Sequence, residues 1–193
     1  MQIKDIAEVM SGYSFRGAIE KDPKGEIFVV QAKDIVSGEI IKDVNGLIPI
    51  SSTVLGTYKN LLQMGDVLVV SRGMKTGIFR STVFKTNMSD VIASSSVHII
   101  RINDNKVLPE YLSHYLNSKH GQVKISQNVS GSYIGSLSKV KLYEMEIPVP
   151  ELNKQKTIID LHENMKRQRI ILKRKIDIKD NIINATFSNL VTN

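Results

Sequence analysis

The residues that most often perform catalysis occur in this chain without the spacing that catalysis needs. Gly73 and Gly77 resemble part of a phosphate-binding loop, but Ile78 and Phe79 follow where a lysine and a hydroxyl residue would be required. The Gly-x-Ser-x-Gly turn that exposes a nucleophilic serine in many hydrolases is absent as well. The sequence therefore predicts neither nucleotide hydrolysis nor acyl transfer of these types.

Metal-dependent and base-modifying chemistry also lacks its usual motifs. Asp22 and Lys24 have the residue types that a nuclease site needs, but they lie in the turn-like charged stretch from Glu20 to Glu26. A methyltransferase that holds a flipped base would need an Asn/Asp-Pro-Pro-aromatic loop, and no Pro-Pro pair occurs. We expect His98 to lie in a strand and His162 to be a solvated helix residue. The four histidines lack zinc-ligand spacing: His98, His114, His120 and His162.

The overall charge is compatible with a polyanionic partner. The net charge is +7 and the pI about 9.5, and lysine and arginine release counterions when they bind phosphate, although many basic proteins never bind nucleic acid. The absence of cysteine excludes disulfides and thiolate metal sites and fits a reducing cytoplasm. No membrane span, signal peptide, metal or cofactor is predicted. If the protein acts on DNA, we expect a partner to perform the chemistry.

The first 150 residues have a mixed α and β pattern. Short β-branched runs predict strands at 27–31, 67–70 and 97–102. Pro109 is expected to open a helix that Gly121 ends. The apolar residues between 142 and 149 mostly indicate a further strand. Gly/Ser/Asn-rich loops are expected at 71–77 and 126–136.

Pro148 and Pro150 mark the clearest boundary, because two prolines separated by one residue do not fit inside a helix. The sequence therefore predicts a globular domain at 1–150 and a helical region at 151–193. No glycine or proline follows Pro150.

The region after the boundary has one apolar stripe at nearly coiled-coil spacing. A helix from about Asn153 to Asn189 would be roughly 55 Å long at 1.5 Å per residue, so we expect it to overhang the domain and to pair with a second copy. The alternative is a helix that folds back onto 1–150. The stripe comprises Ile158, Leu161, Met165, Leu172, Ile176, Ile183, Phe187 and Leu190.

An ordered set of segments resembles the specificity subunits of type I restriction-modification enzymes. The most recognisable are 64–73, MGDVLVVSRG, and the junction at 146–155, EIPVPELNKQ. Two weaker matches precede the first of these segments, and two lie between the two segments. They are residues 3–12, 30–38, 91–96 and 128–134.

This resemblance implies an α/β (α+β) target-recognition domain followed by a long helix. It implies a non-catalytic role in binding double-stranded DNA together with methyltransferase subunits and, in full complexes, a motor-nuclease subunit. The usual member has two recognition domains and two helices, whereas this chain has one of each. We therefore expect a homodimer with an antiparallel coiled coil that binds a palindromic bipartite site. The helix start near Leu152 and Ile158 is a candidate methyltransferase-binding surface.

Three segments combine basic with small or amide side chains, which suits phosphate and base-edge contacts. They are residues 13–16, 71–80 and 124–133. The alternative interpretation is that these segments are ordinary solvated turns. The basic face of the long helix also has two interpretations of equal weight: it lies along the DNA between the half-sites, or it keeps the helix soluble. The candidate DNA contacts are Arg16, Arg72, Lys75, Thr76, Arg80, Lys124, Gln127, Asn128, Ser132 and Tyr133.

Two other functions fit parts of the pattern. A stand-alone dimeric DNA-binding regulator would use the helix to dimerise, although no helix-turn-helix is recognisable. A structural adaptor or truncated specificity fragment would be monomeric or poorly folded.

Overall fold

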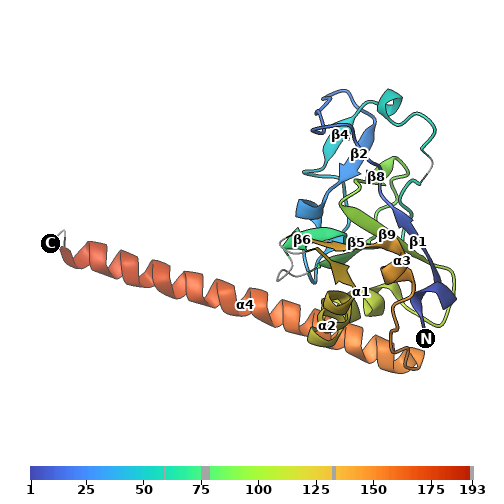
Figure 1. The fold of residues 1–193 in the computed structure, drawn as a ribbon. Helices are drawn as coiled ribbons and strands as arrows, with labels where there is room; N and C mark the ends of the chain where they lie inside the picture. Colours follow the sequence, from blue (N-terminus) through green and yellow to red (C-terminus); the bar gives the residue numbers. More distant parts are fainter. Residues whose placement is uncertain (59, 75–78, 132–133, 192–193) are drawn as a thin grey trace.

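The computed structural model describes residues 1–58, 60–74, 79–131 and 134–191. It consists of a globular domain and one long helix, α4 (Leu152–Val191), which passes along one side of the domain and projects far beyond it (Figure 1). The predicted fold class, a mixed α and β domain followed by a long C-terminal helix, therefore matches the architecture.

A five-stranded sheet forms the centre of the domain, in the order β1-β9-β5-β7-β3. Neighbouring strands are antiparallel except for β3 and β7. Every residue of β5 and β7 is buried, which explains why the β5 sequence is a continuous apolar run. The strands are β1 (Ala7–Ser11), β3 (Ile40–Ile41), β5 (Val67–Val70), β7 (Ser81–Phe84) and β9 (Val97–Ile102).

Two smaller sheets flank the central one. In the first, ordered β4-β2-β8, strand β2 is parallel to β8 and antiparallel to β4. The second is ordered β10-β11-β6 and is antiparallel. The first contains β2 (Ile27–Val30), β4 (Ile48–Ile50) and β8 (Val91–Ala93), and the second contains β6 (Arg72–Met74), β10 (Val129–Ser130) and β11 (Ile134–Leu137).

Short helices cover one end of the central sheet. Helix α1 (Pro109–Asn117) begins with Pro109 as expected and packs on β7 and β5, and α2 (Lys119–Gln127) follows it directly. Helix α3 (Lys139–Tyr143) lies against β1. Three short 3-10 turns complete the domain: Ile3–Asp5, Ala32–Asp34 and Ser52–Val54.

Gly121 does not end the first helix, contrary to the sequence-based expectation. The break occurs at Ser118, whose hydroxyl oxygen accepts a hydrogen bond from the Gly121 amide and so caps the start of α2. A Cβ at Gly121 would lie 2.0 Å from the Tyr115 carbonyl oxygen. The glycine is therefore explained by the close approach of the two helices rather than by a helix stop.

The strand expected between 142 and 149 is also wrong. Leu142 lies in α3, and Leu142, Met145 and Ile147 are buried in the main core. The only pairing in this stretch is an isolated bridge between Gln2 and Glu146. Alternating apolar residues here reflect contacts of a helix and an irregular segment with the same core.

A buried ion pair fixes the turn before β5. The carboxylate of Asp66 is 1% exposed and accepts from Arg101 Nε at 2.9 Å and Nη2 at 2.7 Å. Arg101 Nη2 also donates to the Leu61 carbonyl oxygen. Gly65, with a φ of 93°, supplies the left-handed backbone that this turn requires. The ion pair therefore links this turn to the central sheet, and both charged side chains have hydrogen-bond partners.

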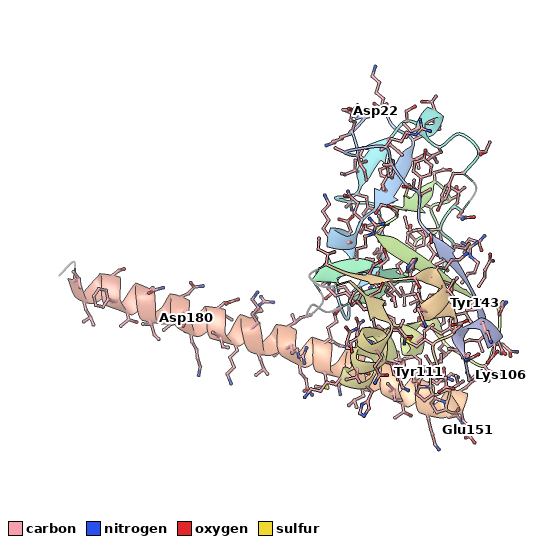
Figure 2. All side chains as sticks on the ribbon, viewed as in Figure 1. Asp22, Lys106, Tyr111, Tyr143, Glu151 and Asp180 are labelled. Carbon is pink, nitrogen blue, oxygen red and sulfur yellow. The ribbon has the colours of Figure 1, made fainter. Side chains whose placement is uncertain are left out.

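Helix α4 (Leu152–Val191) has 40 residues and is about 60 Å long at 1.5 Å per residue. Its first turns pack on the domain, whereas the part around Asp180 has no domain element beside it (Figure 2). The helix therefore overhangs its own core as predicted and does not fold back along its full length. Within the described residues, no helix is both long and apolar enough to cross a membrane.

Candidate nucleic-acid interface

Strand β6 lies in the predicted DNA-contact segment 71–80 and pairs with β11, which directly follows the predicted segment 124–133. Arg72 lies opposite Ser136, and Gly73 lies opposite Gly135. The segments 71–77 and 126–136 are thus not simply loops, because strands β6, β10 and β11 form within them. Strand pairing places residues more than 60 positions apart in sequence on one small surface.

The alternation of side chains along a strand defines one face of this sheet. Directly opposite residues share a face, as do residues two positions apart in one strand. Arg72, Ser136 and Ile134 consequently point to the same side. Arg72 is exposed and Ile134 is 65% exposed. We call the face defined by Arg72, Ile134 and Ser136 the β6–β11 face.

Hydrogen bonds attach this sheet firmly to the central one. The Ser71 amide donates to the Ser96 carbonyl oxygen at 2.8 Å, and the Leu137 amide donates to the Ser71 carbonyl oxygen at 2.9 Å. The buried His98 ring in β9 adds a 2.7 Å contact from Nε2 to the Leu137 carbonyl oxygen. His98 lies in a strand as predicted.

The environment of His98 favours the neutral ring. Burial lowers the pKa of His98, and the hydrogen bond to Leu137 opposes that shift. In the neutral ring, Nε2 carries the proton that this bond requires, because a carbonyl oxygen only accepts. His98 therefore acts as an uncharged link between the core and the β6–β11 face.

The remaining described candidates of these two segments differ in exposure and in whether their side chains already form hydrogen bonds within the domain. Lys124 and Gln127 are exposed in the last turns of α2, so the first part of the predicted segment 124–133 is helical. Asn128 is the C-cap residue, and its Nδ2 donates to the Lys124 carbonyl oxygen. Arg80 Nη2 donates to the Ala32 carbonyl oxygen at 3.0 Å, so part of its guanidinium already holds a neighbouring turn.

Arg16 belongs to a different part of the domain. Its segment begins at Tyr13, which forms a bridge with Ser94, and Phe15 packs against the cluster of the β4-β2-β8 sheet. The Arg16 side chain is exposed beside that cluster. The structure therefore separates this third segment from the β6–β11 face. Four further predicted contacts, Lys75, Thr76, Ser132 and Tyr133, lie outside the described residues.

Ile134 and Ser136 were missed by the sequence-based selection. Both lie just beyond the segment 124–133, within which the candidate contacts were chosen. The sequence did contain one indication of this surface. Within 126–136, a Gly/Ser stretch lies next to Ile134, an apolar residue that belongs to no helical or strand-like apolar pattern. Its pairing partner could not be inferred from local sequence.

The apolar stripe of α4 is largely open to solvent beyond its first turn. Ile158 packs against the main core and is half-buried. The other predicted stripe residues are 45% to 76% exposed. These exposed residues are Leu161, Met165, Leu172, Ile176, Ile183, Phe187 and Leu190.

Another face of α4 attaches the helix to the domain. Gln155 is fully buried, its Oε1 accepts from the Leu108 amide, and its Nε2 donates to the Lys106 and Pro150 carbonyl oxygens at 2.7 Å. The Tyr111 hydroxyl donates to the Pro148 carbonyl oxygen. These bonds fix the proline-containing junction and the start of the helix.

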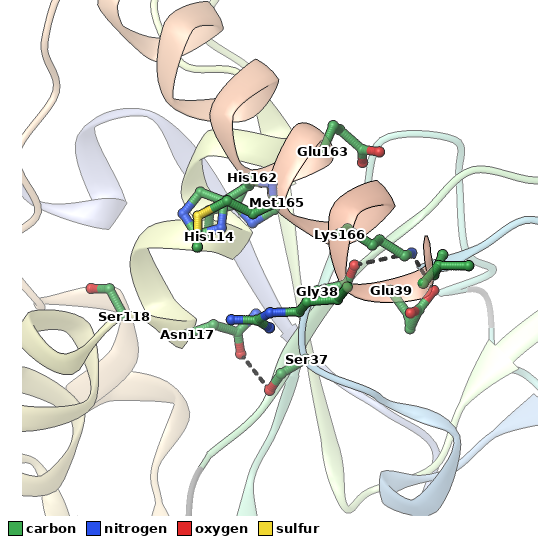
Figure 3. A pocket seen from close by; sticks show the side chains of 12 residues that line it. Ser37, Gly38, Glu39, His114, Asn117, Ser118, His162, Glu163, Met165 and Lys166 are labelled. Atoms are coloured by element: carbon green, nitrogen blue, oxygen red, sulfur yellow. Dashed lines mark hydrogen bonds and ion pairs between the residues drawn. The ribbon is translucent and has the colours of Figure 1, made fainter. Parts of the chain in front are cut away.

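Two polar contacts continue this attachment further along α4. The exposed ring of His162 stacks on His114 of α1, with centroids 4.2 Å apart and planes 8° apart. Lys166 Nζ donates to the Gly38 carbonyl oxygen at 3.3 Å and pairs with the Glu39 carboxylate. Figure 3 shows both contacts around a cavity of about 440 Å³ between the helix and the domain. His162 is thus partly solvated, as expected, but has a specific partner.

The described part of the chain holds no group of three or more His, Cys, Asp or Glu side chains suited to a metal ion.

Comparisons with known proteins agree with this architecture. The family model for the type I restriction modification DNA specificity domain matches residues 1–180, and the chain belongs to that family. No curated protein sequence gives a match.

Solved structures show the same fold. The HsdS subunit from Thermoanaerobacter tengcongensis has 17% identity and a TM-score of 0.57, with 90% of this chain and 38% of that chain covered. A chain from a structure on complex assembly and conformational transition of the type I R-M system has 15% identity and a TM-score of 0.63, with coverage of 90% and 39%. This chain therefore spans about two fifths of the length of those chains.

Proposed function

We propose that this protein is a DNA-recognition subunit of a type I restriction-modification complex, and that two copies bind one palindromic bipartite site. The observation that most supports this proposal is a specificity domain joined to a long helix whose apolar stripe is exposed. Each domain would bind one half-site. The two helices would set the distance between them.

The β6–β11 face is our candidate for the surface that contacts DNA bases. Arg72 offers a guanidinium that matches the O6 and N7 acceptors of guanine, and Ile134 could contact a thymine methyl group. Ser136 has a hydroxyl that both donates and accepts. Among the described residues the Arg72 guanidinium has no hydrogen-bond or ion-pair partner, and the exposed side chain is available to a ligand. Lys124 and Gln127 would extend the contact along α2.

The exposed apolar stripe of α4 would be buried most simply against the same stripe of a second copy. An antiparallel two-fold pairing in which Leu161 of one helix meets Leu190 of the other places the symmetry axis between Lys175 and Ile176. Ile176 of each copy then lies beside the axis. Burying large apolar side chains that are now mostly exposed contributes about 1.5–3 kcal/mol for each fully buried residue.

The helix is long enough to act as a spacer. Half-sites on one side of DNA are separated by multiples of one helical turn, roughly 34–36 Å. The 40 residues of α4 extend about 60 Å. An antiparallel pair of such helices can therefore hold two domains more than one DNA turn apart.

We place methylation and cleavage in partner subunits. The chain would direct methyltransferase subunits, and in a full complex a motor-nuclease subunit, to the site in the cytoplasm. The start of α4 near Leu152, which is 40% exposed, is the candidate methyltransferase-binding surface. Ile158 is largely occupied by the domain's own core and contributes less to such a surface.

Selection of binding sites from randomised DNA tests the proposal. The purified protein, reconstituted with the methyltransferase subunit of its own system, is expected to enrich a bipartite motif whose halves are inverted repeats. An enriched motif that does not require the methyltransferase would instead support the stand-alone regulator. No enrichment from a correctly assembled complex would contradict a recognition role.

A further inference from the structure

The contacts between α4 and the domain fall into an inner and an outer set. The inner set is apolar or buried and comprises Gln155, Ile158 and Ile159, which contact the main core or its bordering loops. The outer set lies one to two turns further along and is polar. It consists of the His114–His162 stack and the pairing of Lys166 with Glu39.

The outer contacts approach the helix from two different elements. His114 belongs to α1, whereas Gly38 and Glu39 lie in the turn before β3. Figure 3 shows these two supports on either side of the cavity beneath the helix. Contacts from two directions, beyond the point where the helix is anchored, restrict the angle at which it leaves the domain.

We propose that the outer set, which we call the brace, fixes the direction of α4 and thereby the number of unspecified base pairs between the two half-sites. This inference rests on the proposed function. It assigns a positioning role in specificity to His114, His162, Glu39 and Lys166, none of which needs to touch DNA.

The length of the helix makes a small angle matter. Ile176, beside the proposed symmetry axis, is 18 residues beyond Ile158, a distance of about 27 Å. A tilt of about 10° about Ile158 moves this point sideways by about 5 Å, more than the 3.4 Å rise of one base pair. The two domains then change their angle to each other and to the DNA, so a different gap is needed for both to reach their half-sites.

The brace can be removed without removing the anchor. His162 is exposed, and the side chains of Lys166 and Glu39 are 34% and 54% exposed. Gln155 and the core contacts of Ile158 stay in place in brace variants. We therefore expect His162→Ala/Lys166→Ala to fold normally and to keep its affinity for a single half-site.

The experiment measures binding of the reconstituted complex to a series of duplexes in which the gap varies by one base pair. The wild-type complex is expected to prefer one gap about tenfold over gaps one base pair longer or shorter. The His162→Ala/Lys166→Ala complex should show about a twofold preference. Lys156→Ala, which removes one charge from the same helix at an exposed position, should keep the wild-type preference.

A charge exchange provides the decisive second variant. Glu39→Lys alone should broaden the gap preference, and Glu39→Lys with Lys166→Glu should restore it. A wild-type preference retained in both the double-alanine and the Glu39→Lys complexes would overturn the brace. A wild-type complex that binds all gaps equally would contradict the bipartite function itself, and with it this inference.

Discussion

Arg72 in strand β6 lies directly opposite Ser136 in strand β11, so two segments distant in sequence share one face of a small sheet. The same face includes the exposed Ile134. Hydrogen bonds through Ser71, His98 and Leu137 attach the sheet to the buried central strands. A basic, a hydroxyl and an apolar side chain are thereby presented on a rigid support, which suits direct contact with base edges.

Arg72→Ala should weaken DNA binding about ten- to hundredfold, because a good arginine contact to guanine contributes about 1–3 kcal/mol of discrimination. Stability should not change, because the side chain is exposed and has no partner among the described residues. Lys21→Ala, at an exposed position elsewhere in the domain, is the matched control. Titration at several salt concentrations separates a base contact from a phosphate contact, since loss of one phosphate contact lowers the salt slope by about 1.

Ile134→Glu should reduce DNA binding by about tenfold or more, because it places a carboxylate on a face that we expect to lie near phosphates. Ile134 is 65% exposed, so the thermal midpoint should stay close to that of the wild type. Val140→Glu adds the same charge to α3 at a position 58% exposed. Equal losses in the two variants would show that net charge, rather than the β6–β11 face, is responsible.

Ile176→Cys should form a disulfide-linked dimer under mild oxidation, because the proposed antiparallel pairing places the two copies of this residue beside the symmetry axis. The chain contains no cysteine, so the introduced thiol is the only one. Ile178→Cys lies on the opposite side of the helix, about 200° away at 100° per residue. Non-reducing electrophoresis should show a dimer band for the first variant only. Equal cross-linking of both would contradict the pairing.

Acidification should loosen the joint between α1 and α4. The pKa of His114 is lowered from about 6.5 to about 4, first because burial disfavours the charged ring and second because of His162. Lys166 adds to this shift, whereas Glu163 and Glu110 oppose it. Between these pH values an unfolded or undocked His114 binds a proton that the folded one does not, so stability falls as pH falls from about 6.5 to about 4.

Urea unfolding at several pH values measures this effect. His114→Asn should flatten the dependence between about pH 6.5 and pH 4, whereas His120→Asn, which changes an exposed histidine on α2, should not. A nuclear magnetic resonance titration should place the midpoint of His114 well below 6.5. A midpoint at 6.5 would show that the stack does not bury the ring.

Elements with strong local periodicity were predictable from the sequence. The apolar runs predicted strands close to the observed β2, β5 and β9. The apolar stripe predicted a helix from about 153 to 189, and the observed α4 is Leu152–Val191. Short strands such as β6 and β10 were not predictable, because glycine and serine have little intrinsic preference for strands and their pairing depends on distant residues. Gly121 was misassigned for a similar reason, since its neighbour Tyr115 decides its role.

In the candidate site, too, some features were predictable from local sequence and others depended on distant residues. Composition identified the segments that contain Arg72, Lys124 and Gln127, but not that strand pairing joins the first of these to Ser136 and Ile134. Composition also grouped Arg16 with them, although its segment packs beside the β4-β2-β8 sheet. A local pattern indicates which residues suit a contact, whereas long-range hydrogen bonds decide which of them share a surface.

The most direct test of the account is a single-molecule methylation map of the host genome with and without this gene. We predict that deletion removes methylation from one motif, that the motif is bipartite, and that its halves are inverted repeats. Complementation with the wild-type gene should restore it. An asymmetric lost motif would contradict the homodimer, and no lost motif in cells that express the methyltransferase would contradict the recognition role.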